Sequence, residues 1–112
     1  MMQAFYDAIK HLAAGQVYAV VAPASAQYPT LVYTPIDETR IVSLDGINPL
    51  RRSRVQVDAY ARTLLACEQL QDDVLSALLA DIHSVADVRM GLTDFDAQAG
   101  VYRMSVDFTY YR

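Results

Sequence analysis

Residues 52–60 read Arg-Ser-Arg-Val-Gln-Val-Asp-Ala-Tyr, and this stretch decides the fold because its polar and apolar residues alternate. Val55, Val57 and Ala59 fall on one side of an extended chain. Arg54, Gln56 and Asp58 fall on the other side. A period of two is typical of a strand with one buried face. The stretch therefore predicts a half-buried β-strand.

A helix and a hairpin are expected after this strand. Residues 62–82 carry apolar side chains at helical spacing, with acidic side chains opposite them. The apolar set is Leu64, Cys67, Val74, Leu75, Leu78 and Ile82, and the acidic set is Glu68, Asp72 and Asp73. Residues 86–93 and 101–111 then predict two antiparallel strands. Asp94 to Gly100 would form the turn between them.

Before the central strand, the pattern predicts a helix over residues 2–14, with Phe5, Ile9 and Leu12 along one stripe. Gly15 would end this helix. Residues 17–21 and 31–34 predict two short strands joined by a loop rich in Ala, Ser and Pro. Pro35 would end the second strand or place it at an edge of the sheet.

Residues 37–50 predict a long loop, because Asp45-Gly46 and Asn48-Pro49 are both turn signals. Ile41-Val42 would form at most a short strand inside it. Long loops in small domains tend to be functional. This loop is therefore the first candidate for an interaction segment.

Together these elements predict one α+β domain over residues 1–112, with a mainly antiparallel sheet and both helices on one face. The other sheet face would be polar, since one wet face is normal for such sheets. It would serve either as a solvated surface or as a contact for neighbouring subunits or a channel. Its expected members are Arg54, Gln56, Asp58, Arg103, Ser105, Asp107 and Thr109.

Composition narrows the class of protein. The chain has 112 residues and a formal net charge of -4, which is not the basic balance of a nucleic-acid-binding domain. A single cysteine excludes an internal disulfide. We expect no signal peptide and no membrane partner, because no apolar run approaches the length of a membrane span.

No group of residues predicts catalysis, a metal or a cofactor. His11 and His83 are the only histidines, and neither is spaced to share a metal ion with a second ligand. Cys67 lies on the apolar side of the expected helix, where a thiol behaves as a small buried hydrophobe. Asp94-Phe95-Asp96 lacks the rest of a calcium loop. We therefore expect a protein that is not an enzyme.

Three stretches resemble a known family. The first is residues 28–33. The second runs from Val42-Ser43-Leu44-Asp45-Gly46 through Leu50 to Ala61. The third is residues 94–108. Their order, with a leading and a middle helix, resembles the small tail-completion proteins of long-tailed phages and prophages. That family is similar in fold to the tail terminator of lambda-like phages. The resemblance covers essentially the whole chain, and residues 44–60 are its most specific part.

The resemblance implies a structural virion protein with no catalytic residue and no cofactor. Such proteins form a ring, a hexamer, at the head-proximal end of the tail tube after synthesis in the host cytoplasm. The implied partners are further copies of the chain, the tail tube protein and the head–tail connector. DNA would only pass through the central channel.

Two sets of residues are candidates for this role. Asp45, Arg51, Arg52 and Arg54 are expected to contact a neighbouring subunit or the tube, because arginine suits protein interfaces. Asp58 and Asp107 are expected to face the channel, where acidic groups would keep DNA from adhering. Glu68 and Asp72 on the helix are rival candidates for the channel.

Two alternatives stay open. A head-side connector, either a stopper or an adaptor, has similar length, although stoppers are typically small β-barrels and this chain predicts two helices. A protein-binding module from a prophage is the second alternative. Tyrosine-rich edges would suit such a module, and the chain has eight tyrosines.

Overall fold

The computed structural model describes residues 3–43, 46–91 and 94–111 and confirms an α+β fold. Helix α1 spans Gln3–Ile9 and helix α2 spans Leu64–Asp81, with a short 3-10 turn, η1, at Ala13–Gly15. The strands are β1 Val17–Ala19, β2 Thr30–Ser43, β3 Gly46–Ala61, β4 Val85–Met90, β5 Asp94–Asp96 and β6 Val101–Tyr111.

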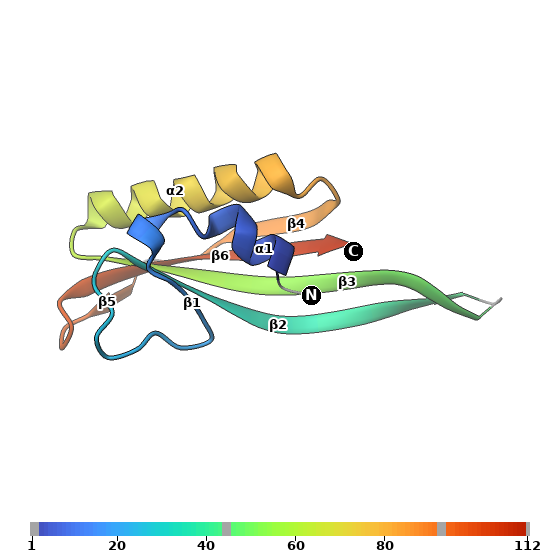
Figure 1. Ribbon diagram of the computed structural model, residues 1–112, viewed down its shortest axis with the longest axis horizontal. Helices are drawn as coiled ribbons and strands as arrows, with labels where there is room; N and C mark the ends of the chain where they lie inside the picture. Colours follow the sequence, from blue (N-terminus) through green and yellow to red (C-terminus); the bar gives the residue numbers. More distant parts are fainter. Residues whose placement is uncertain (1–2, 44–45, 92–93, 112) are drawn as a thin grey trace.

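A single sheet forms one layer and the helices form the other. The strand order is β1-β2-β3-β6-β4, and β5 pairs with the opposite end of β6. Every pairing is antiparallel except β1 with β2. Both helices lie over the same face of the sheet (Figure 1), as the sequence predicts. Neither is long and apolar enough to cross a membrane.

The core lies between the helices and the sheet. Phe5 of α1 is fully buried, with its ring centroid 6.1 Å from Phe108, 6.1 Å from Tyr33 and 6.0 Å from Tyr110. Val55 and Val57 of the central strand are each 1% exposed beneath the helices. Burial of the alternating apolar positions thus fixes which face of β3 points inward.

Helix α1 is shorter than residues 2–14, which corrects the sequence prediction. Its last turn closes where Lys10 N–H donates to Tyr6 O at 2.8 Å. Ala13, Ala14 and Gly15 then take positive φ values of 50°, 53° and 84°. Three left-handed residues in succession cannot continue a right-handed helix. They turn the chain so that β1 can pair with β2.

The prediction of a loop over residues 37–50 is wrong, and so is the predicted end of the second strand at Pro35. Strands β2 and β3 instead form one long antiparallel hairpin, paired from Thr30↔Tyr60 to Ser43↔Gly46. A register shift between Pro35 and Asp37 lets the strand continue past the proline. Strand β2 ends at Ser43 and β3 begins at Gly46, so the second residue of the Asp45-Gly46 turn signal begins a strand.

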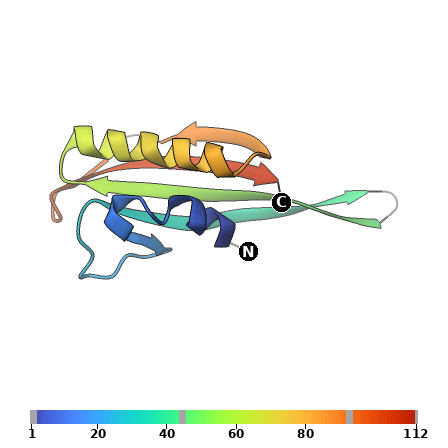
Figure 2. The ribbon, with the colours of Figure 1, turned by 45° about the horizontal axis from the view of Figure 1, so that its top comes forward.

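The hairpin extends well beyond the rest of the domain. Pairing of β3 with β6 ends at Arg52↔Tyr111, so among the described residues no third strand lies beside the segment from Arg40 to Arg51. We call the described part of this segment, residues 40–43 and 46–51, the arm. It projects past the helices in two views (Figures 1 and 2) and gives the molecule a length of 53 Å against 23 Å in the other directions.

Helix α2 begins at a side-chain cap. Thr63 has an extended backbone, and its Oγ1 accepts a hydrogen bond from Ala66 N–H at 3.1 Å. Replacement of Thr63 by Ala should lower the free energy of unfolding by about 1 kcal/mol, because that N–H loses its partner. Thr63→Ser keeps the hydroxyl and serves as the control. Urea denaturation measures both, and equal stability of the two variants would contradict the cap.

Candidate functional site

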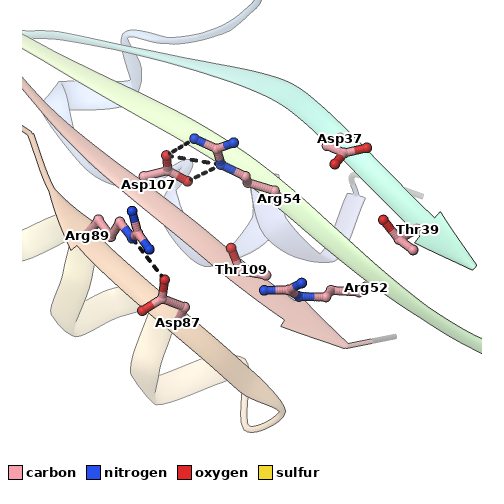
Figure 3. A pocket seen from close by; sticks show the side chains of 8 residues that line it. All are labelled: Asp37, Thr39, Arg52, Arg54, Asp87, Arg89, Asp107 and Thr109. Carbon is pink, nitrogen blue, oxygen red and sulfur yellow. Dashed lines mark hydrogen bonds and ion pairs between the residues drawn. The ribbon is translucent and has the colours of Figure 1, made fainter. Parts of the chain in front are cut away.

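The polar face of the sheet is one of two candidate surfaces. In the pairing register Arg54 lies opposite Thr109, Gln56 opposite Asp107 and Asp58 opposite Ser105. These side chains therefore share the face turned away from the helices, which confirms the predicted arrangement. A shallow pocket of about 240 Å³ crosses this face, and Figure 3 shows its lining residues: Asp37, Thr39, Arg52, Arg54, Asp87, Arg89, Asp107 and Thr109.

The strongest contact on this face joins β3 to β6. Arg54 Nε donates to Asp107 Oδ1 at 2.8 Å, and Arg54 Nη2 donates to Asp107 Oδ2 at 2.5 Å (Figure 3). A two-point arginine–carboxylate pair fixes both side chains in direction as well as distance. On the neighbouring strand Arg89 Nε bonds Asp87 Oδ2 at 3.1 Å.

The pocket has no net formal charge. Its lining includes three arginines and three aspartates, in alternation across four strands. A face of this kind would not concentrate DNA as a basic groove does. It can make many directional hydrogen bonds with another polar surface.

The Arg54 hydrogen bonds hold the pKa of Asp107 below its ordinary value, and its partial burial opposes them. A carboxylate with a lowered folded-state pKa stabilises the fold above its unfolded-state pKa. That stabilisation is lost as the pH falls through the folded-state pKa. Asp107→Asn should therefore make unfolding less dependent on pH in the acid range. Thermal denaturation from pH 7 to pH 2 measures this, with Asp96→Asn as an exposed control, and parallel curves for the wild type and Asp107→Asn would refute it.

Asp58 does not present its carboxylate freely to solvent. It is 9% exposed and accepts a hydrogen bond from Gln56 Nε2 at 3.0 Å. Residues 20–26 and Tyr28 lie beside it and help to line a second pocket of about 330 Å³. Of the two residues expected to face the channel, Asp107 therefore lies in the open polar pocket and Asp58 does not.

The arm is the second candidate surface, and it begins with arginines. Arg40 lies directly opposite Arg51 in the register, and Arg52 follows. Arg51 Nη1 is 3.9 Å from Glu38 Oε1, whereas Arg40 and Arg52 are exposed. Asp45, the fourth residue expected at this interface, lies outside the described residues.

Sequence reasoning missed four members of the polar pocket. Asp37 and Thr39 were placed in a loop, although their spacing by two fits a strand. Asp87 and Arg89 alternate with Val88 and Met90, so the same signal could have found them. The register across the sheet, which brings these residues beside Arg54 and Asp107, could not be read from one segment alone.

The thiol of Cys67 lies in the core, not in a polar site. Among the described residues no cluster of His, Cys, Asp or Glu could hold a metal ion. Cys67 is fully buried, and its Sγ–H donates a hydrogen bond to Ala59 O at 3.2 Å. Burial raises the pKa of this thiol, which disfavours the nucleophilic thiolate.

An elongated α+β subunit with a mixed-charge face and a projecting two-stranded arm has the features of an assembly protein. The comparisons define it further. The family model described as Tail completion protein gp17 matches residues 6–111, and the chain belongs to this family. It is a structural protein of the phage virion tail.

One solved structure that the chain resembles is described as the virion of a native gene transfer agent particle. The TM-score is 0.60 at 14% identity, and the match covers 99% of this chain and 92% of that one. At this identity the likeness shows the fold. The search of curated proteins gave no significant match.

Proposed function

We propose that the chain is one subunit of a closed ring, a hexamer, at the head-proximal end of the tail tube. The ring ends tube polymerisation and joins the tail to the head connector. Its partners are further copies of itself, the tube protein and the connector, and DNA passes through its centre. The subunit is made in the host bacterial cytoplasm and acts in the virion without catalysis.

The observation that carries this proposal is the arm. A two-stranded hairpin is marginally stable alone in water, yet this one continues beyond the third strand that supports it. Such a ribbon gains stability when another chain packs against it. Membership of the tail-completion family makes neighbouring subunits and tail proteins the natural candidates. The resemblance to a chain of a phage-like particle supports the same role.

We further propose that the polar face contributes to the channel, with Asp107 as one of its acidic members. The three aspartates and three arginines of the pocket largely neutralise each other. A neutral, hydrogen-bonded lining would let DNA move past without the salt-dependent adhesion that a basic lining causes. Asp58 would contribute little to this property because it is nearly buried.

Deletion of the gene in its phage tests the ring. Negative-stain electron microscopy of the lysate should show filled heads beside unattached tails, some of them overlong, and a plasmid copy of the gene should restore joined particles. Heads that leak DNA, beside tails of normal length, would indicate a head-side connector instead. Intact infectious particles would overturn the structural role.

A further inference from the structure

Two surface regions of the chain are rich in charge, and the sign of the charge is opposite in the two. The first is the base of the arm, where Arg40 and Arg51 face each other across the two strands. Like charges directly opposite in an antiparallel pair are destabilising. Glu38 is 3.9 Å from Arg51, but Arg52 adds a further exposed cation beside them.

The second region is the outer side of α2. Residues 64–81 include Glu68, Asp72, Asp73 and Asp81 and have no Lys, Arg or His. The first turn has no acidic residue, and the last turn has no basic one. This is the reverse of the distribution that a helix dipole favours. Helix stability therefore does not account for the charges of α2.

Exposed apolar side chains accompany both regions. Leu65 and Leu79 on α2 are 78% and 46% exposed. Ile36 and Leu50, beside the arginines of the hairpin, are 45% and 39% exposed. A surface that combines exposed leucines with one sign of charge is suited to a partner with the opposite charge.

The two regions do not meet within one subunit, because the arm projects past the end of α2 (Figures 1 and 2). A second copy brings them together. We propose that the base of the arm of one subunit docks on the outer face of α2 in the next. Arg40 and Arg51, which share one side of the ribbon, then lie against Glu68 and Asp72, which are one turn apart on the exposed side of α2. This deepens the proposed function, since it assigns the surfaces by which the ring closes.

The contact is head-to-tail, because each subunit offers its arm to one neighbour and its helix to the other. Contacts of this kind close into rings when the rotation between subunits permits it. Arg51 and Arg52 are adjacent in a strand and point to opposite faces of the ribbon. Arg40 shares the side of Arg51, so these two cations reach one helix together, whereas Arg52 stays in the polar pocket.

Exchange of the charges between the arm and α2 tests the contact, in phage whose wild-type gene is replaced by each variant. Arg40→Glu with Arg51→Glu should lower the yield of joined particles by about tenfold or more, and Glu68→Arg with Asp72→Arg should do the same. The four substitutions together should restore most of the yield. The neutral pair Arg40→Gln with Arg51→Gln should fall between, and Lys10→Glu, at an exposed position outside both surfaces, is the matched control. Circular dichroism checks that each variant folds.

Cross-linking provides a second measurement. Arg40→Cys combined with Asp72→Cys should give a ladder of linked subunits in purified particles under oxidising conditions, whereas each single substitution should not. Absence of the ladder, together with a fourfold variant no better than either double variant, would overturn the contact. If gene deletion still leaves heads and tails unjoined, the proposed ring is supported and only this contact is refuted. If gene deletion has no effect, both the ring and the contact are refuted.

Discussion

A variant without the arm should fold normally and yet fail completely in assembly. Replacement of Arg40 to Arg51 by Asn-Gly would join Thr39 to Arg52, which are already paired across the hairpin. Asn-Gly is the preferred sequence for a two-residue turn between antiparallel strands. Every described pairing of β3 with β6 is kept, since the first of them is Arg52↔Tyr111.

The stability of the shortened protein should stay within about 1 kcal/mol of the wild type, because Arg40, Leu50 and Arg51, the removed residues whose side chains the structure describes, lie outside the core. Its ability to restore joined particles to a deletion phage should fall to the level of no gene at all. Urea denaturation and electron microscopy measure the two properties. Normal particles assembled with the shortened protein would show that the arm takes part in none of the interfaces proposed for it.

A useful control keeps the whole arm and makes a conservative change at the position just before it. Thr39→Ser retains the hydroxyl in the polar pocket and the length of the strand. This variant should behave as the wild type in both assays. Loss of assembly in this control would mean that the assay responds to any change in β2, not to loss of the arm.

Phe5→Ala should have the largest effect on stability. The ring of Phe5 is fully buried and lies within 6.1 Å of the ring centroids of Tyr33, Phe108 and Tyr110. Removal of a buried phenylalanine costs about 3–5 kcal/mol, through lost burial and the cavity that remains. A domain of this size has a total stability of about 5–15 kcal/mol. The variant should be partly unfolded or melt far below the wild type.

Phe95→Ala is the matched control, because Phe95 is 50% exposed and contacts Tyr102 on the far end of β6. It should change the melting temperature little. Differential scanning calorimetry compares the two variants with the wild type. Equal and small shifts would show that the N-terminal helix does not complete the core.

Local patterns predicted much of this fold. Alternation in residues 52–60 and 101–111 indicated β3 and β6, because a strand with one buried face must repeat every two residues. Helical spacing indicated α2, although Leu64, expected on its buried side, is 45% exposed, while Leu70 and Gln71 are buried instead. Gln71 is accommodated because its Nε2 donates to Ser105 O at 2.9 Å.

The tertiary structure alone decided the length of the hairpin and the pairing of charges across the sheet. Turn signals near Asp45 and Asn48 indicate where a chain can reverse, but they do not tell a loop from the end of a long hairpin. Pairing across the hairpin, with a register shift that accommodates Pro35, settled that question. The sequence by itself determined the central part of β3, strand β6, helix α2 and the polar side of the sheet. Which charges became partners, as Arg54 and Asp107 did, depended on the register between distant strands, which no local pattern encodes.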